Sequence, residues 1–506
     1  MFNNHKRGPM LWLIAAVLLL GTAAQGDTTM NDPADQEARL FMPYAWAMWL
    51  PDVAAAQDFA DAWKSRTLNG CGFQILWDKI EPEQGKFDWQ WLDERLDVFV
   101  NAGLRVHLRF ATQNNRPSWF KARMQRGPDG ELISTGDRTL VSFADVDAQQ
   151  TIARTLSKVA EHVWTRYEGQ SPYPVVAMLV QCSRPAETEY AHDEWSDFSG
   201  VAQDDFRTWL QSRFESIDEL NEAWGTRYAD FSQITLQDAH IYDFNHYRTF
   251  ALARAIKTYA DGIHQTPGAE AAVQFGSVWD GLSVYRGTRD VRALIEPVEW
   301  VMVDDYPIYD HAHSMDHLRG HARDKMWGNE IDGPGIVTDE LGLEQCITSA
   351  RRGAKFLFAA NWNAESIRRT DRTFWEKVMV ELQKPAPDIS PTRAIVASLA
   401  TVYRQEPQQG VNGTYHDLYA RLSDNSKNPV DILTDTAIIT HPEWLEQYTD
   451  GIYISAEQLW MTYELVDALT DLSVPVYVEN RQVAMFDEYS RARSGQPESW
   501  KIDPQQ

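Results

Sequence analysis

The sequence predicts a (β/α)8 barrel followed by a smaller doubly wound, flavodoxin-like α/β domain, and three observations favour this fold class. Between residues 38 and 384, short apolar runs alternate eight times with segments of helical spacing, which is typical of parallel strands joined by helices. A proline-rich stretch at 385–391 then indicates a linker. The alternation resumes over 392–490 on a smaller scale, without the G-x-G-x-x-G turn of a dinucleotide-binding sheet.

Eight short apolar runs are the expected barrel strands, because strands of a parallel sheet are buried on both faces. In chain order they lie at residues 40–50, 72–77, 104–110, 175–180, 271–278, 300–304, 325–330 and 355–360. Segments of helical spacing separate them at residues 54–66, 91–102, 147–167, 204–214, 244–264 and 343–352. In the second domain we expect strands at 393–403, 430–434, 451–455 and 474–478, helices at 415–422 and 456–469, and a disordered tail at 491–506.

The first 26 residues are typical of a secretory signal peptide. Lys6 and Arg7 form a basic start, residues 11–20 are apolar, and small residues follow at 21–24. An uncleaved membrane anchor is the alternative, but the apolar run is short for a bilayer span. We therefore expect an exported protein, periplasmic or extracellular, with no stable membrane span after processing.

Charge and metal-binding residue types restrict the function. The formal net charge of −26 would repel a phosphate backbone, so we expect no nucleic-acid partner. The three cysteines are scattered and include no C-x-x-C pair, which argues against a full set of disulfides and against a cysteine-based zinc site. His313, His317 and His321 share one helical face and could bind a metal, but a solvated helix is the favoured interpretation. We expect no metal and no cofactor.

Carboxylates follow two of the expected strands at the end where a (β/α)8 barrel places its chemistry. Glu187 and Glu189 come just after strand four, and Glu330 ends strand seven within N-E-I-D-G-P-G. Hydrolysis of a glycosidic bond needs one carboxylic acid to protonate the leaving oxygen, and a second carboxylate to attack or to activate water. The alternatives are a solvated acidic loop around Glu187 and a barrel-rim salt bridge at Glu330.

Several motifs together resemble the family 42 glycoside hydrolases, bacterial β-galactosidase-like enzymes. The first is W-x-x-x-E-P-x-x-G-x-F-D-W-x-W-L-D at residues 77–93, and R-P-S-W follows at 116–119. Further similar segments lie at 206–226 and 352–362, so the resemblance covers about residues 40–480. It implies a retaining glycosidase with an acid/base glutamate after strand four and Glu330 as the nucleophile. Homo-oligomerisation is an expectation by the same analogy.

Strand four departs from the family pattern. The family has Asn-Glu-Tyr where this chain has Thr188, Glu189 and Tyr190, and the missing Asn puts galactose specificity in question. The segment V-Q-C-S-R-P-A-E-T-E-Y is also similar to the V-G-L-G-P-A-G-E-L-R-Y of β-amylases, whose acid glutamate corresponds to Glu187. Glu187 is therefore the preferred acid/base and Glu189 the alternative. Because β-amylases invert, retention and inversion both stay open.

An oligosaccharide or polysaccharide is the expected substrate, and a carbohydrate-binding barrel with altered catalysis is the competing interpretation. The chain contains 20 Trp, and tryptophans can stack on sugar rings or fill a core. The candidate substrate-binding residues, drawn from strand ends and the loops after them, are Trp46, Trp77, Arg109, Trp279, Asp305, Tyr306, Asn361 and Trp362.

Overall fold

The computed structural model describes most of the chain between residues 39 and 503. The described residues are 39–135, 138–183, 185–278, 281–304, 310–333, 338–360, 362–405, 413–423, 429–479, 485–492 and 496–503. The expected signal peptide lies outside them, as do four candidate site residues, Trp279, Asp305, Tyr306 and Asn361. Among the residues described, none of the helices is both long enough and apolar enough to span a bilayer.

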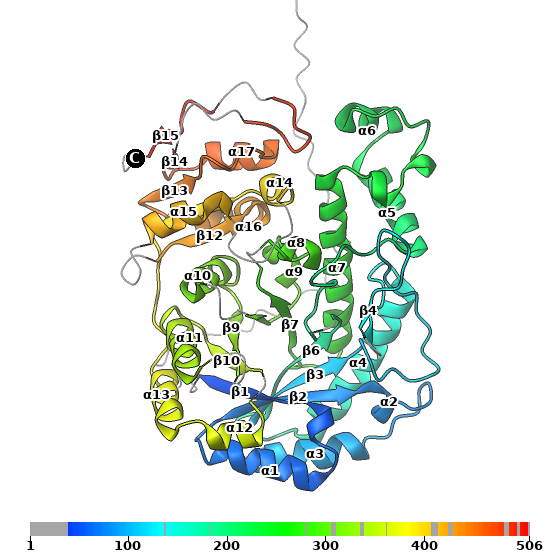
Figure 1. Ribbon diagram of the computed structural model, residues 1–506, viewed down its shortest axis with the longest axis vertical. Coiled ribbons are helices and arrows are strands. Elements are labelled where there is room, and N and C mark those ends of the chain that lie inside the picture. The colour runs from blue at the N-terminus through cyan, green and yellow to red at the C-terminus, as the bar shows by residue number, and fades with distance from the viewer. Residues whose placement is uncertain are drawn as a thin grey trace, which may run out of the picture. The chain divides into compact units, whose positions relative to one another are not determined.

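Eight parallel strands close into a barrel, in the order β1-β10-β9-β8-β7-β6-β3-β2, as the sequence predicts (Figure 1). The strands are β1 (Leu40–Ala45), β2 (Gly70–Leu76), β3 (Arg105–Ala111), β6 (Val175–Gln181), β7 (Ala271–Gly276), β8 (Trp300–Asp304), β9 (Met326–Ile331) and β10 (Phe356–Ala359). A hairpin of β4 (Ser134–Thr135) and β5 (Arg138–Thr139) lies in the loop after β3.

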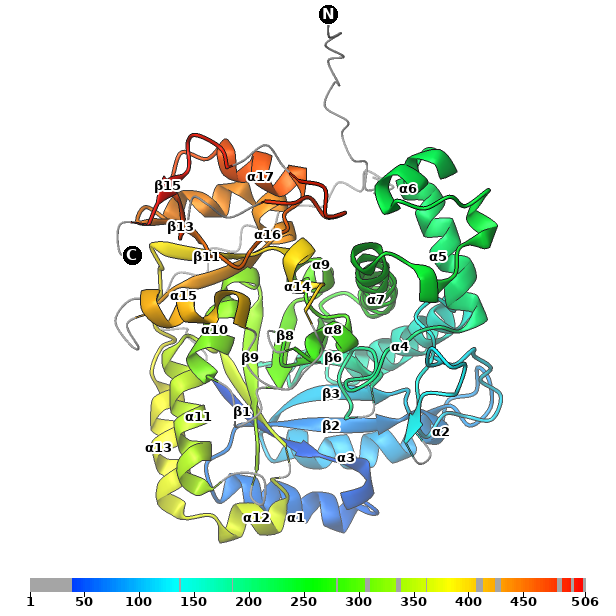
Figure 2. The ribbon, with the colours of Figure 1, turned by 45° about the horizontal axis from the view of Figure 1, so that its top comes forward.

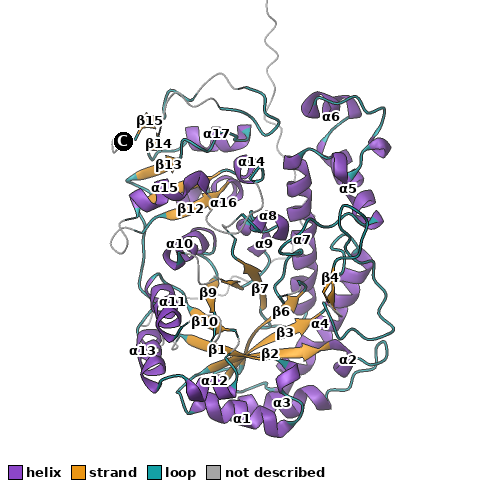
Figure 3. Ribbon diagram, in the orientation of Figure 1, coloured by secondary structure: helices purple, strands orange, loops and turns teal. Residues whose placement is uncertain are grey.

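Helices surround the barrel strands, as Figures 2 and 3 show. The main ones are α1 (Val53–Lys64), α3 (Gln90–Asn101), α4 (Val146–Arg166), α7 (Ile241–Ile263), α10 (His311–His321), α11 (Asp339–Arg351) and α13 (Arg372–Gln383). Shorter elements in the loops are η1 (Ala47–Trp49), α2 (Trp77–Ile80), α5 (Gly200–Arg213), α6 (Ile217–Trp224), η2 (Phe231–Gln233), η3 (Leu236–Asp238), α8 (Ser283–Arg286), α9 (Val291–Ile295) and α12 (Ala364–Arg369). Their apolar faces and the outward side chains of the strands form one continuous core.

Alternation along each strand separates two sets of side chains. In β1, Phe41 packs toward the helices, whereas Leu40, Met42 and Tyr44 belong to a second cluster inside the barrel. That inner cluster also contains residues of β6, β7, β8 and β10. The inner positions are apolar through most of the barrel and become polar where the strands end, for example at Gln181. This polar layer holds the candidate active site.

Gly328 leaves room for a large ring inside the barrel, two residues before Glu330. A Cβ at this position would lie 2.4 Å from the backbone oxygen of Phe356 and 2.7 Å from its ring. We expect Gly328→Ala to lower the free energy of unfolding by about 3 kcal/mol, because backbone and a buried ring would both have to move. Gly200→Ala is the matched control, since a Cβ there meets nothing within 4 Å. Urea denaturation of both variants checks this, and an equal, small effect would contradict it.

The second domain is a five-stranded parallel sheet in the order β12-β11-β13-β14-β15. Its strands are β11 (Arg393–Ala397), β12 (Asp431–Thr434), β13 (Gly451–Ile454), β14 (Val476–Val478) and β15 (Lys501–Ile502). Its helices are α14 (Leu399–Val402), α15 (Gly413–Leu422), α16 (Asp435–Thr440), η4 (Pro442–Gln447) and α17 (Tyr463–Thr470). Separate hydrophobic clusters cover the two faces of the sheet, as the predicted doubly wound fold requires.

Two sequence predictions for this domain are wrong. The tail after residue 490 was expected to be disordered, but Lys501 and Ile502 extend the sheet as β15, and Trp500 beside them is buried. The tail has a polar composition, but the apolar contacts of Trp500 with the sheet stabilise its ordered conformation. The helix expected at 456–469 begins only at Tyr463, where the Thr462 side chain caps it.

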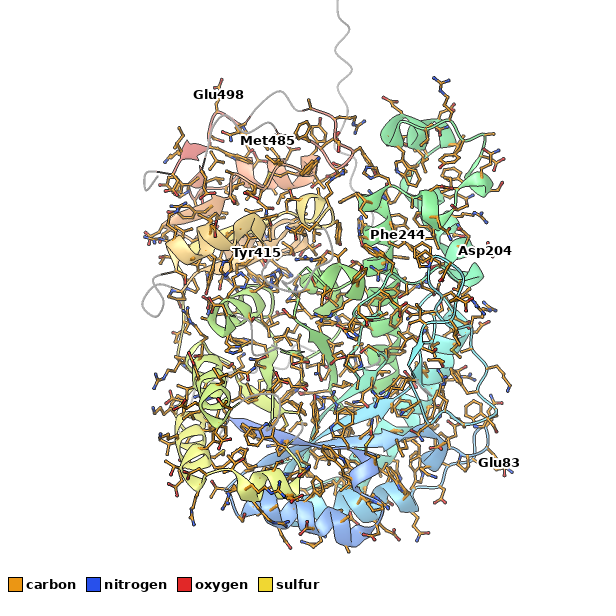
Figure 4. All side chains as sticks on the ribbon, viewed as in Figure 1. Glu83, Asp204, Phe244, Tyr415, Met485 and Glu498 are labelled. Atoms are coloured by element: carbon orange, nitrogen blue, oxygen red, sulfur yellow. The ribbon has the colours of Figure 1, made fainter. Side chains whose placement is uncertain are left out.

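The histidine-rich helix α10 packs against β12 of the second sheet, so the expectation of a solvated helix is wrong. His317 and His321 stack with ring centroids 4.8 Å apart, and His313 contacts Tyr419 of α15 at 4.6 Å. Burial lowers the pKa of all three histidines, that of His321 to about 4. Figure 4 labels Tyr415 in the same contact region. These rings therefore serve the packing of the barrel against the second domain.

Candidate active site

Four side chains from four strands meet at the carboxyl end of the barrel interior. Glu330 of β9 accepts hydrogen bonds from the Tyr44 hydroxyl and from the Gln274 amide nitrogen. The same hydroxyl also lies 2.7 Å from Gln274 Oε1, so its single proton can serve either acceptor. Arg109 donates to the Tyr44 oxygen, and its guanidinium carbon lies 4.0 Å from the centroid of the tyrosine ring. Glu330 is thus held from two sides, with only 5% of its surface exposed.

Burial is the main influence on the Glu330 carboxyl and raises its pKa to about 7. Arg109 and the Tyr44 hydrogen bond oppose this rise, because both favour the charged form. The negative charges of Glu187 and Asp332 add to it. Glu330 and Glu187 therefore lie within each other's electrostatic field, as a pair of carboxylates that divide acid and nucleophile roles must do.

Asp304 and Asp332 complete a cluster of carboxylates with Glu330 and Glu187. Asp304 ends β8 and is the register partner of Glu330, while Asp332 follows β9 by one residue. Burial, then the charges of Glu330, Asp332 and Glu187, raise the pKa of Asp304 well above its usual value, and Arg286 opposes this. Burial and mutual repulsion therefore favour the protonated forms of Glu330 and Asp304.

The titration of Glu330 makes a testable contribution to stability. Between its usual pKa of 4.5 and about 7, the folded chain holds a proton that the unfolded chain has released, so stability falls as the pH rises through this window. Because glutamine does not titrate, the unfolding free energy of Glu330→Gln minus that of the parent should be about 2–3 kcal/mol larger at pH 8 than at pH 5. Urea denaturation at both pH values measures the difference. A gap that does not change with pH would contradict the shift.

Glu187 is fixed by the turn that follows β6. The Ser183 hydroxyl donates to Glu187 Oε2 at 2.7 Å and accepts from the Glu187 backbone nitrogen at 3.0 Å. The Glu187 carbonyl accepts from the nitrogens of Cys182 and Ser183, both at 2.9 Å. Ala186 has a φ of 95°, a value that glycine adopts far more readily, so the turn places Glu187 at a cost in backbone energy. The negative charge of Glu187 contributes to raising the pKa of Tyr44, Glu330 and Asp304.

Glu189, the alternative acid/base, has other partners. Its Oε2 accepts from the backbone nitrogen of Gly276 at 2.8 Å, and its Oε1 lies 3.5 Å from Nε of Arg286. Thr188 between the two glutamates donates its hydroxyl to the Val180 carbonyl at 2.7 Å. The structure thus brings Glu187 together with Glu330 and engages Glu189 in an ion pair.

The candidate substrate-binding residues fall into two groups. Arg109 belongs to the site, and half-buried Trp46 follows β1 beside Tyr44, with ring centroids 5.3 Å apart. Trp77 and Trp362 are instead completely buried in the outer core, which corrects their assignment to the site. Trp77 donates to Glu81 at 2.9 Å, and Trp362 packs on Phe374 and Trp375. The two large aromatic side chains therefore pack against the helices outside the barrel and do not line its mouth.

Sequence reasoning missed four members of the site: Tyr44, Gln274, Asp304 and Asp332. The signal that could have found Tyr44, Gln274 and Asp304 is the two-residue period of the strands. Counting back from Glu330 identifies the inward positions of β9, and its sheet neighbours then point the same way. A polar residue at the last inward position of a strand is costly in a core, so it indicates a site. Among the described residues, no group of three or more His, Cys, Asp and Glu is arranged to hold a metal ion.

Comparison with known proteins places this geometry in a family. The sequence model of glycoside hydrolase family 42, described as beta-galactosidase, matches residues 55–322. Beta-galactosidase Bga of Halorubrum lacusprofundi is 27% identical over 313 residues, covering 56% of this chain and 41% of that protein. Beta-galactosidase BbgII of Bifidobacterium bifidum is 33% identical over 167 residues, covering 31% of this chain and 22% of that protein. The chain thus spans less than half the length of these relatives.

Solved structures share the fold at low sequence identity. A beta-galactosidase from Halorubrum lacusprofundi has a TM-score of 0.70 at 17% identity, covering 90% of this chain and 75% of that one. The catalytic domain of the beta-amylase from Paenibacillus polymyxa has a TM-score of 0.57 at 14% identity, covering 69% of this chain and 99% of that one. At 14% identity the second likeness concerns the fold alone, and the β-amylase-like motif after β6 stays a prediction. Because the family model matches more than half of its residues, the chain belongs to glycoside hydrolase family 42.

Proposed function

We propose that this protein is a glycoside hydrolase that cleaves β-linked sugars, with β-galactosides as the first substrates to test. The observation that carries the proposal is the placement of Glu187 and Glu330. They come from strand ends β6 and β9, both are almost completely buried, and each lies in the field of the other at the carboxyl end of the barrel. Family membership and the beta-galactosidase relatives support the same substrate class.

The chemistry that best fits these side chains is a double displacement. Ionised Glu330 attacks the anomeric carbon and forms a glycosyl ester, while Glu187 gives its proton to the departing oxygen. Glu187 then takes a proton from water, whose oxygen attacks the same carbon and releases Glu330. Tyr44 and Gln274 orient the Glu330 carboxylate, and Arg109 holds Tyr44 in place. Formation and breakdown of the glycosyl ester both need that orientation.

The test is hydrolysis of a panel of aryl β-glycosides and β-linked oligosaccharides, with the anomeric form of the first product followed by NMR. We expect turnover of β-galactosides and a first product that retains the β configuration. An α product would leave the glycosidase assignment standing and replace double displacement by inversion. A folded chain without turnover on the whole panel would contradict the proposal.

A second candidate function is carbohydrate binding without efficient catalysis. Thr188 stands where the family pattern has Asn, and its hydroxyl is committed to the Val180 carbonyl, so it offers no amide to a sugar. Calorimetric titration of the folded protein with the same oligosaccharides separates the two functions: binding without turnover favours this one.

We also propose export, supported by the signal-like residues 1–26. Deletion of these residues is expected to abolish the appearance of the protein in the periplasm or the medium.

A further inference from the structure

Glu189 occupies the position of the glutamate in the family motif Asn-Glu-Tyr, yet its carboxylate makes the contacts of a structural clamp. It is completely buried, accepts from the backbone nitrogen of Gly276 at the end of β7, and lies 3.5 Å from Arg286 of α8. Since Glu189 follows β6, these contacts tie the end of β6 to the end of the neighbouring strand. The clamp therefore joins the segment that bears Glu187 to the adjacent strand.

The site of Arg286 is shaped for its guanidinium. Arg286 Nη1 donates to the Ser277 carbonyl at 2.8 Å. A Cβ on Gly276 would lie 2.7 Å from the guanidinium carbon and 2.9 Å from Nε, so only glycine lets the side chain rest against the end of β7. The positive charge of Arg286 also acts on Asp304 of the carboxylate cluster. Arg286 thus pairs with Glu189 at the edge of the candidate active site.

The residue between the two glutamates is fixed as well. The Thr188 nitrogen donates to the Gln274 carbonyl at 2.7 Å, and its hydroxyl donates to the Val180 carbonyl. Glu187 is therefore bounded by the strained turn at Ala186 on one side and by the clamped Glu189 on the other. A displacement of about 1 Å at a proton donor costs on the order of 100-fold in rate, so the clamp has a direct consequence for Glu187.

From this arrangement we infer that Glu189 and Arg286 are positioning residues for Glu187, and that in this chain the proton-donor role lies two positions before the family glutamate. The inference rests on the proposed function. Glu189 stays paired with Arg286 throughout the reaction, and Glu187 alone exchanges a proton with the leaving group and water.

Leaving groups show which residues the protonation step depends on, and the pH profile distinguishes the proton donor from a positioning residue. The dinitrophenolate released from a dinitrophenyl galactoside leaves without being protonated. The leaving oxygens of phenyl galactoside and lactose are more basic and need a proton from an acid. We expect Glu187→Gln to lower kcat/KM by about 10²–10⁴-fold for phenyl galactoside and lactose and far less for the dinitrophenyl substrate, since kcat/KM reports the first step, in which Glu187 acts as the acid. Because Glu189 acts through Glu187, we expect Glu189→Gln to lower kcat and kcat/KM by about 10–100-fold on the phenyl substrate, to affect the dinitrophenyl substrate less, and to keep the alkaline limb of the pH profile that Glu187→Gln loses. Loss of the alkaline limb in Glu189→Gln, or its retention in Glu187→Gln, would overturn the inference.

Stability measurements test the clamp independently of activity. In a double-mutant cycle of Glu189→Gln and Arg286→Met, we expect the effects on the unfolding equilibrium to be non-additive by at least about fivefold. Additive effects would overturn the ion pair. Arg286→Lys keeps the charge, so partial recovery of kcat supports the clamp even if Arg286→Met folds poorly. Asp205→Asn is the matched control, because its 2.7 Å pair with Arg254 joins α5 to α7 and includes neither Glu187 nor Glu189.

The two arms separate the two possible failures. A parent chain that is inactive on every substrate would remove the proposed function, while the cycle would still report whether Glu189 and Arg286 are coupled. An active parent with a coupled pair, in which Glu189→Gln leaves kcat unchanged, would overturn the positioning role and leave the glycosidase proposal intact. Asp205→Asn should leave kcat unchanged. A loss of kcat in this control would show that the loss of any ion pair lowers kcat.

Discussion

Replacing Glu330 by Gln is expected to lower kcat/KM by about 10⁴-fold or more on every β-glycoside that the parent cleaves. The amide has nearly the shape of the carboxylate and can keep contacts with Tyr44 and Gln274, but it cannot form the glycosyl ester. Because the loss concerns the attack itself, it should be equal for good and poor leaving groups. Steady-state rates on a dinitrophenyl and a phenyl galactoside measure this.

Two further variants make that result specific. Glu344→Gln removes a carboxylate from the exposed side of α11 and should leave kcat/KM unchanged. Glu330→Gly opens space for azide, which can attack in place of the carboxylate and release an α-galactosyl azide. Recovery of turnover with azide, with the inverted product, would assign the nucleophile to Glu330. A Glu330→Gln variant within tenfold of the parent would remove Glu330 from the reaction.

The fold could be predicted because the barrel depends on a pattern that the sequence carries directly. Each barrel strand is a short apolar run, and eight such strands alternating with helices suit a closed parallel barrel, whereas the shorter run of the second domain suits an open sheet. The apolar pattern does not fix where each strand ends: β1 ends at Ala45, five residues before the expected end, because the chain turns into η1 there. The tail at 501–502 joins the second sheet through backbone pairing with β14, which side-chain patterns do not encode.

The site was partly predictable for the same reason. Glu187, Glu330 and Arg109 lie at or near strand ends, where sequence position alone suggests function. Trp77 and Trp362 occupy similar positions along the chain, but their rings turn outward to the helices, and one-dimensional spacing does not distinguish a residue of the mouth from one of the outer core. The histidines of α10 looked solvated because their burial comes from a domain far away in the sequence. Contacts between distant segments are what the sequence pattern lacks.

Replacing Arg109 by Met is expected to lower the free energy of unfolding by about 3–5 kcal/mol at pH 8, because the charge of buried Glu330 would lose the positive charge that opposes its burial. The loss should be smaller at pH 5, where Glu330 is protonated. Arg105→Met is the matched control: it changes an arginine on the same strand at the opposite end of the barrel, facing Glu270. Denaturation at both pH values measures the difference, and equal losses in the two variants would contradict it.

The same substitution should affect activity in a direction that the electrostatics fix. Arg109 lowers the pKa of Glu330, so its removal raises that pKa from its value of about 7, and the acid limb of kcat/KM moves to higher pH. Arg109 also donates to Tyr44 and, at 3.4 Å, to the Ala186 carbonyl beside Glu187, so both catalytic segments lose a shared support. We expect kcat/KM at pH 7 to fall by about 100-fold or more. Tyr44→Phe keeps the guanidinium and removes the hydroxyl that donates to Glu330, so it should shift the acid limb less; an equal shift would mean that the hydroxyl, and not the charge of Arg109, keeps Glu330 ionised.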